Sequence, residues 1–184
     1  MECCCCDEKE PCTAKISIFQ QLDRASQEEI SNIATHREIK KGQMLFTPDD
    51  NHGLYLISSG RVKVYEITAS GKEYLLQVLL AGDFVGEEAL FSKEQTYTYG
   101  EALSDGRVCF IDRADFMDLL TKHPSISLKL LEEFSKRMRH NAHQIATNAE
   151  PVQARLAEYL LNLSVAQDSD SFEIPLQLKE LSSY

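Results

Sequence analysis

The chain has 184 residues, 43% of them hydrophobic, which is enough for one domain with a real core plus an appendage. Its formal net charge is -10, so most of its surface would repel a phosphate backbone and any nucleic-acid-binding face must be local. The sequence shows neither an apolar run approaching the ~20 residues of a bilayer span nor a secretory signal. These features predict a cytoplasmic protein with no membrane partner. We find no P-loop, Ser/His/Asp set or catalytic carboxylate pair, so an enzyme is not expected.

Cysteines are distributed very unevenly. Five of the six lie within the first twelve residues, whereas Cys109 stands alone far along the chain. Cys3, Cys6 and Cys12 have the spacing C-x2-C-x5-C. Three thiolates and a fourth ligand from elsewhere are what an iron–sulfur cluster or a closed zinc site requires. In a reducing compartment this pattern indicates metal binding or redox sensing more than a structural disulfide framework.

The next part of the chain predicts an α+β fold. Ser26 to Glu29 has the pattern of a capping box, which predicts a short helix containing Ile30 and Ile33. From Thr35 onwards, short runs rich in β-branched and aromatic residues alternate with turns, most of which contain glycine. These runs predict strands at residues 37–39, 44–46, 54–57, 61–67, 74–79, 84–85, 97–99 and 108–111. Eight short strands with such turns are typical of a jelly roll or β-roll.

Two helices are expected after the strands. The first covers residues 114–120, and Pro124 suits the first turn of the second, which runs without Gly or Pro to about Glu150. Apolar residues recur in this second helix at heptad-like spacing, at Leu128, Leu131, Phe134, Met138, Ala142 and Ile145. This stripe predicts an interface with a partner helix. An ordinary amphipathic helix lying on its own β-roll is the alternative.

Four segments carry a family resemblance: Lys41–Phe46, Leu54–Tyr65, Gly71–Glu73 and Leu80–Phe91. In order and spacing they resemble the cyclic-nucleotide-binding β-roll of the CRP/FNR family of bacterial transcription regulators. The resemblance implies a cysteine-rich sensor segment at 1–15, a sensory β-roll at 16–123, a dimerisation helix at 124–150 and the start of a winged helix-turn-helix domain at 151–184. Because the last residues read as a helix cut off near its start, we expect a fragment without its recognition helix. The implied partners are a second copy of the chain, a double-stranded DNA operator bound through the missing C-terminal part, and RNA polymerase.

Cyclic-nucleotide binders of this family use a Gly-Glu pair for the ribose and a later Arg, followed by Ser or Thr, for the cyclic phosphate. Gly86 and Glu87 match the first pair, but Tyr97 occupies the position of the Arg and is followed by Thr98. Without the guanidinium, a buried phosphate would lose a charge-assisted bidentate contact. We therefore expect a vestigial effector pocket, with Glu87 as a surface or cap-like carboxylate.

The resemblance extends to FNR, the oxygen sensor of this family, in which three N-terminal cysteines and one late β-roll cysteine hold a [4Fe-4S] cluster. Cys3, Cys6, Cys12 and Cys109 match that pattern, and Cys4 or Cys5 are potential substitutes. Loss of the cluster to oxygen would then weaken the dimer and its binding to DNA. A second hypothesis is a metal-free regulator with a disulfide between an N-terminal cysteine and Cys109, as is thought to occur in some FNR-like proteins of Gram-positive bacteria. The remaining alternatives are a β-roll that binds an effector other than cyclic AMP, a zinc site, or an inert N-terminal tail.

Overall fold

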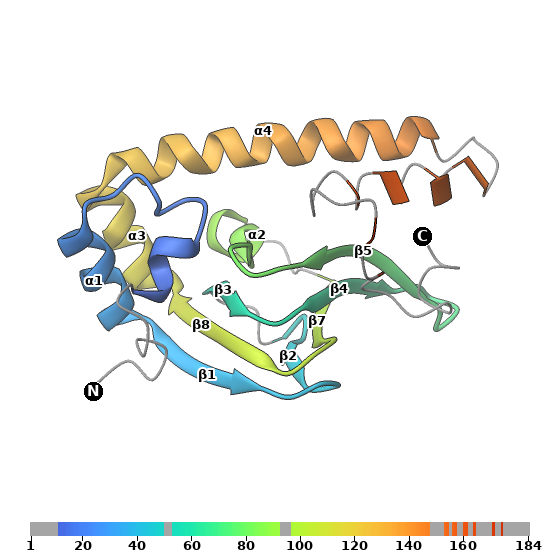
Figure 1. Ribbon diagram of the computed structural model, residues 1–184, viewed down its shortest axis with the longest axis horizontal. Coiled ribbons are helices and arrows are strands. Elements are labelled where there is room, and N and C mark those ends of the chain that lie inside the picture. Colours follow the sequence, from blue (N-terminus) through green and yellow to red (C-terminus); the bar gives the residue numbers. More distant parts are fainter. Residues whose placement is uncertain are drawn as a thin grey trace.

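The computed structural model describes residues 11–49, 53–92 and 97–147, with scattered positions between 153 and 174. Among these residues, eight strands form two four-stranded antiparallel sheets. Figure 1 shows how the strands and helices are arranged. One sheet has the order β1-β8-β3-β6 and the other β2-β7-β4-β5. The strands are β1 (Thr35–Ile39), β2 (Met44–Phe46), β3 (Gly53–Ser59), β4 (Val62–Ile67), β5 (Glu73–Leu79), β6 (Phe84–Val85), β7 (Thr98–Ala102) and β8 (Gly106–Asp112). The predicted β-roll is confirmed, because every expected run overlaps a strand, although Arg61 and Tyr97 lie just before β4 and β7.

Helical segments flank the roll. They are the short 3-10 helix η1 (Cys12–Lys15) and the α-helices α1 (Arg24–Ile33), α2 (Glu87–Phe91), α3 (Arg113–Lys122) and α4 (Pro124–Thr147). In Figure 1, η1, α1 and α3 gather at one end of the roll, and α4 runs along one side of it. No helix among the described residues is long and apolar enough to cross a membrane.

Side chains of the central strands point alternately to the two faces of the sheet, and this creates two separate hydrophobic cores. On β3, Leu54 and Leu56 pack in one cluster, whereas Tyr55 and Ile57 pack in another. Because successive side chains of a strand point to opposite faces, this sheet is covered on both sides. The first cluster also contains residues of η1, α1, α3 and α4, so it lies between the sheet and the helices. Cys109 of β8 belongs to this helix-side cluster, whereas its neighbour Val108 belongs to the other.

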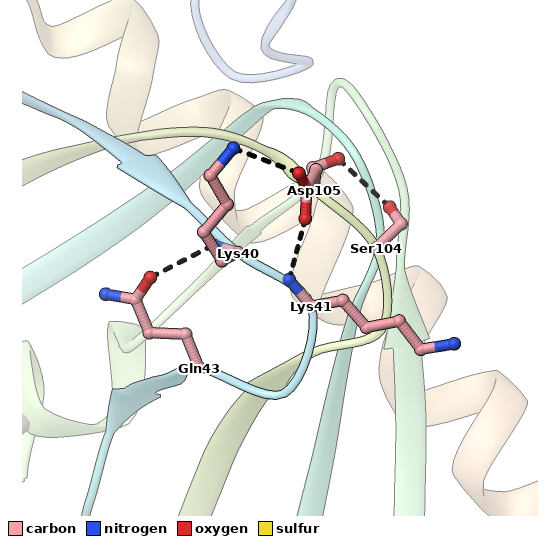
Figure 2. A network of polar contacts seen from close by, with 5 residues as sticks. All are labelled: Lys40, Lys41, Gln43, Ser104 and Asp105. Carbon is pink, nitrogen blue, oxygen red and sulfur yellow. Dashed lines mark hydrogen bonds and ion pairs between the residues drawn. The ribbon is translucent and has the colours of Figure 1, made fainter.

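The turn between β1 and β2 is tied to the turn between β7 and β8 (Figure 2). Asp105 accepts hydrogen bonds from the backbone N–H of Lys41 at 2.9 Å and from Nζ of Lys40 at 3.0 Å. Both contacts lower the pKa of Asp105, and the Lys41 N–H has the larger effect. Gly60 completes this end of the roll with a φ of 88°, where a Cβ would lie 2.8 Å from the Asp105 carbonyl oxygen. Only glycine fits there without strain.

The start of α1 differs from the prediction. Its N-cap is Asp23, whose carboxylate accepts the backbone N–H of Ser26 at 2.9 Å and also the Ser26 hydroxyl at 2.9 Å. The predicted capping box at Ser26 is therefore wrong, since Ser26 already lies in the first helical turn. An ionised carboxylate is a stronger acceptor for the orphan N–H groups than a hydroxyl, and this favours the earlier start.

Helix α4 presents two different faces. Ile126 and Leu130 are buried in the helix-side cluster, and Phe134 packs partly against it. In contrast, Leu128, Leu131 and Met138 are 66%, 61% and 72% exposed, and Ala142 is exposed as well. The side chain of Ile145 lies outside the described residues. The predicted helix is confirmed, and its use as a dimer interface stays a prediction.

Candidate functional site

Two cysteines from opposite parts of the chain meet in the helix-side cluster. The Sγ atoms of Cys12 and Cys109, 97 positions apart in sequence, lie 3.3 Å from each other. The two residues are 5% and 0% exposed, and no disulfide bond joins them. Of the predicted thiol ligands, the structure thus brings together Cys12, the last of the N-terminal cysteines, and Cys109 of β8. Cys3, Cys4, Cys5 and Cys6 lie outside the described residues.

Cys12 is held in place by the anchoring of η1 on α1. The hydroxyl of Thr13 donates to the carbonyl oxygen of Gln27 at 2.8 Å, and the Gln27 side chain donates to the carbonyl oxygen of Phe19 at 3.1 Å. Thr13 and Phe19 are fully buried. Cys12 and Thr13 are therefore fixed in the packed core, because buried polar groups with satisfied hydrogen bonds hold one defined geometry.

His36 is a third member of the site that the sequence analysis did not identify. The β1–β8 register places it directly opposite Cys109, and its Nδ1 lies 3.1 Å from the Cys109 Sγ and 3.8 Å from the Cys12 Sγ. Its Nε2 lies 2.8 Å from the carbonyl oxygen of Ser31 in α1. A carbonyl oxygen only accepts, so Nε2 carries the proton, and in the neutral ring the Nδ1 lone pair faces the two sulfurs.

Two hydroxyl groups complete the surroundings of the sulfurs. The Ser58 Oγ lies 3.3 Å from the Cys109 Sγ, and the Ser31 Oγ lies 3.6 Å from the Cys12 Sγ. The buried pair thus has polar neighbours inside an otherwise apolar cluster. Such an arrangement suits two kinds of chemistry, the reversible joining of two thiols and the binding of a thiophilic metal ion.

The [4Fe-4S] cluster implied by the FNR resemblance fits this pair poorly. Each thiolate of a cubane binds a different iron, so the inorganic core stands between the sulfurs of its ligands. Sulfurs 3.3 Å apart are in direct contact and leave no room for that core. Cluster ligation by Cys12 and Cys109 requires these two side chains to separate.

In the expected effector pocket, Glu87 forms an ion pair with Arg137 of α4. Gly86 precedes α2 with a φ of 101°, and Glu87 is the first residue of that helix. The sequence predicted a surface or cap-like carboxylate at Glu87, and the surface alternative is wrong, because this side chain is only 12% exposed and pairs with the Arg137 guanidinium. The same guanidinium donates to the Phe84 carbonyl oxygen at 2.8 Å and lies over the Phe84 ring, 4.5 Å from its centroid.

Burial raises the pKa of Glu87, and the charge of Arg137 opposes that rise. Tyr97, at the position of the family's Arg, is exposed, and Thr98 begins β7. The cation next to the Gly-Glu pair therefore comes from the long helix, which the sequence pattern of the roll did not reveal. That the pocket is vestigial stays a prediction.

Comparisons with known proteins agree with the fold. Residues 36–123 match the family described as cyclic nucleotide-binding domain. The chain is 33% identical over 174 residues to the probable transcriptional regulator flp of Lacticaseibacillus casei, covering 94% of this chain and 80% of that protein. It is also 33% identical over 156 residues to the fumarate and nitrate reduction regulatory protein of Vibrio cholerae, covering 84% of this chain and 59% of that protein.

Among solved structures, FixK2 from Bradyrhizobium japonicum is similar in fold, with a TM-score of 0.70 and 18% identity, over 83% of this chain and 77% of that one. The roll, the long helix and these similarities define a transcription regulator with a cyclic-nucleotide-binding type of sensory domain. The chain belongs to the CRP/FNR family.

Proposed function

We propose that this chain is the sensory and dimerisation part of a redox-responsive transcription regulator, in which Cys12 and Cys109 form a reversible dithiol–disulfide switch. The observation that carries the proposal is the 3.3 Å contact between their Sγ atoms. A disulfide bond is about 2.0 Å long, so the sulfurs need to approach by about 1.3 Å. Side-chain rotation supplies most of such a movement, and the backbone elements keep their pairing.

Hydrogen peroxide can oxidise the cysteine pair to a disulfide without any cofactor. Cys12, the more exposed of the two, attacks the O–O bond as a thiolate and forms a sulfenic acid, and the expelled hydroxide takes up the proton that the Cys12 thiol lost, which gives one water. The Cys109 sulfur then attacks the Cys12 sulfur and displaces hydroxide, while His36 accepts the Cys109 proton and passes it to that hydroxide, which gives a second water. Two thiols and one hydrogen peroxide become one disulfide and two waters. A dithiol reductant reverses the change.

The position of the cysteine pair suggests how its oxidation state affects the position of α4. Cys109 lies three residues before Asp112, the N-cap of α3, whose carboxylate accepts the Asp115 N–H at 2.9 Å. Phe116 of α3 and Leu130 of α4 pack in the same cluster as both cysteines. Closely packed cores respond to small displacements by switching between discrete arrangements. A change in the sulfur–sulfur separation is therefore expected to shift the long helix.

Peptide mapping tests the switch directly. The chain is treated with hydrogen peroxide, the remaining thiols are alkylated, and non-reduced peptides are examined by mass spectrometry. We expect a cross-linked peptide that joins Cys12 to Cys109 and disappears after dithiothreitol. Cross-links confined to Cys3, Cys4, Cys5 and Cys6 would contradict the proposal.

A [4Fe-4S] cluster is the second candidate, favoured by the C-x2-C-x5-C spacing of Cys3, Cys6 and Cys12 and by the relatives named for fumarate and nitrate reduction. It requires the Cys12–Cys109 contact to open. Anaerobic purification followed by iron and sulfide analysis separates the candidates. A brown protein with about four iron and four sulfide per chain supports the cluster.

The exposed side of α4 is the proposed dimer interface. Replacing Leu131 with glutamate puts a charge into the apolar stripe of both subunits, so we expect the dimer dissociation constant to rise at least about 100-fold. Analytical ultracentrifugation measures the change. Leu80→Glu, at an exposed leucine of the β5–β6 loop, is the matched control and should remain dimeric. An unchanged dimer in Leu131→Glu would place the interface elsewhere.

A further inference from the structure

We propose that Cys12, His36 and Cys109 form a mononuclear binding site for Zn²⁺ when the cysteine pair is reduced. One ligand atom from each of these residues lies within 4.8 Å of the other two. The site shares its sulfurs with the proposed switch, and its role in regulation rests on that function. Its geometry stands on a separate observation, the placement of His36.

The distances suit a single tetrahedral ion. With Zn–S bonds of about 2.3 Å and Zn–N bonds of about 2.0 Å, two sulfurs on one zinc lie about 3.8 Å apart, and a sulfur and a nitrogen about 3.5 Å apart. The observed separations are 3.3 Å between the sulfurs, and 3.1 and 3.8 Å from His36 Nδ1 to the Cys109 and Cys12 sulfurs. Each differs from the ideal value by about half an ångström or less. Small side-chain rotations therefore suffice to close the three groups around an ion.

The outer contacts of His36 are those of a metal-bound imidazole. Metal-ligating histidines nearly always donate their second ring N–H to a carbonyl or carboxylate, which sets the tautomer and the ring orientation. Here Nε2 lies 2.8 Å from the Ser31 carbonyl oxygen, and this contact directs the Nδ1 lone pair towards the sulfurs. The Ser58 hydroxyl, 3.3 Å from the Cys109 Sγ, is placed to donate to a coordinated thiolate.

Charge and ligand type select the ion. Two buried thiolates are unfavourable in an apolar cluster, and a divalent cation neutralises both. Sulfur and imidazole ligands favour zinc over magnesium or calcium, which prefer oxygen. Within residues 11–49, 53–92 and 97–147, the group contains three His, Cys, Asp or Glu ligands. With only the three ligands from the described residues, the fourth position would take an exchangeable ligand.

Zinc and the disulfide are then alternative occupants of one site. Peroxide oxidation of the zinc-bound pair takes two electrons from the thiolates and consumes two protons. It forms the disulfide, releases Zn²⁺ and yields two waters. The metal therefore protects the reduced pair, and its release accompanies oxidation.

Metal titration of the reduced, metal-free chain tests the site. Co²⁺ serves as a spectroscopic probe, and Zn²⁺ affinity is measured by competition with a chromophoric chelator. We expect one ion per chain, with thiolate-to-cobalt charge-transfer bands and the visible bands of a tetrahedral site. His36→Gln should weaken zinc binding more than about 100-fold. This is a larger loss than replacing a hydrogen-bond partner of a metal ligand usually causes. The matched control His123→Gln should bind like the wild type.

A quadruple variant identifies the sulfur ligands. Cys3, Cys4, Cys5 and Cys6 are replaced together by serine, and the protein should still bind one ion with the same charge-transfer bands. Circular dichroism establishes that each variant is folded. Loss of binding in the quadruple variant together with full binding in His36→Gln would overturn the site, as would a reduced wild-type chain that binds no metal.

The two proposals fail in different ways. If the wild type binds zinc and peroxide neither releases it nor joins Cys12 to Cys109, the metal site stands and the switch is wrong. If peroxide forms the disulfide in a chain that binds no zinc, the switch stands and the metal site is wrong. Zinc release in step with disulfide formation supports both.

Discussion

Replacing Cys109 with serine is expected to abolish the redox response of DNA binding in a protein that carries this chain and a complete helix-turn-helix domain. In the unmodified protein, DNA affinities of the oxidised and reduced forms should differ about tenfold or more, a typical coupling between two sites. In Cys109→Ser the ratio should be close to one, because a hydroxyl cannot join the Cys12 sulfur. Fluorescence anisotropy with operator DNA, before and after peroxide, measures the ratio.

Two further variants sharpen this experiment. Cys12→Ser should give the same result, since both sulfurs are needed for one bond. Cys4→Ser is the control and should keep the full response. A Cys109→Ser protein that still responds to peroxide would show that the buried pair is not the switch.

Replacing Arg137 with alanine is expected to lower the free energy of unfolding by about 3 kcal/mol at pH 7. Removal of one partner from a buried ion pair leaves the other charge uncompensated, which typically destabilises a protein by about 3 to 5 kcal/mol. Here the Glu87 side chain is 12% exposed, and that of Arg137 is 27% exposed. The variant also loses the hydrogen bond to the Phe84 carbonyl oxygen and the contact with the Phe84 ring. Urea unfolding measures the loss.

The pH dependence of this loss identifies its cause. Burial raises the pKa of Glu87 above its ordinary value of 4.5, so the folded state holds the proton more tightly than the unfolded state. Stability therefore falls as pH rises from 4.5 towards the folded-state pKa. Without Arg137 the folded-state pKa rises further. The difference between wild type and variant should thus be large at pH 7 and small near pH 4.5.

Neighbouring groups provide the controls for this prediction. The pKa of Asp83 is also raised by burial, and Arg137 opposes that rise too, so a part of the pH effect belongs to Asp83. Arg139→Ala removes an exposed arginine from the same helix and should change stability little. An equal loss for Arg137→Ala at both pH values would attribute its effect to lost packing and not to the carboxylates.

The sequence alone determined the β-roll and the long helix. Short runs of β-branched and aromatic residues between Gly-containing turns defined all eight strands, because both signals are local. Pro124 and the following stretch without Gly or Pro likewise defined α4. The C-x2-C-x5-C spacing and the isolated Cys109 directed attention to thiol chemistry, since residue type and spacing along the chain carry that information.

Only the tertiary structure decided what surrounds the thiols. His36 reaches Cys109 through the β1–β8 register, and Ser31 reaches the same site from α1. The pairing of Arg137 with Glu87 joins residues fifty positions apart in the chain. Such contacts depend on strand order and on how helices dock against a sheet. Register and docking follow from the packing of the whole core, which no local pattern of residues encodes.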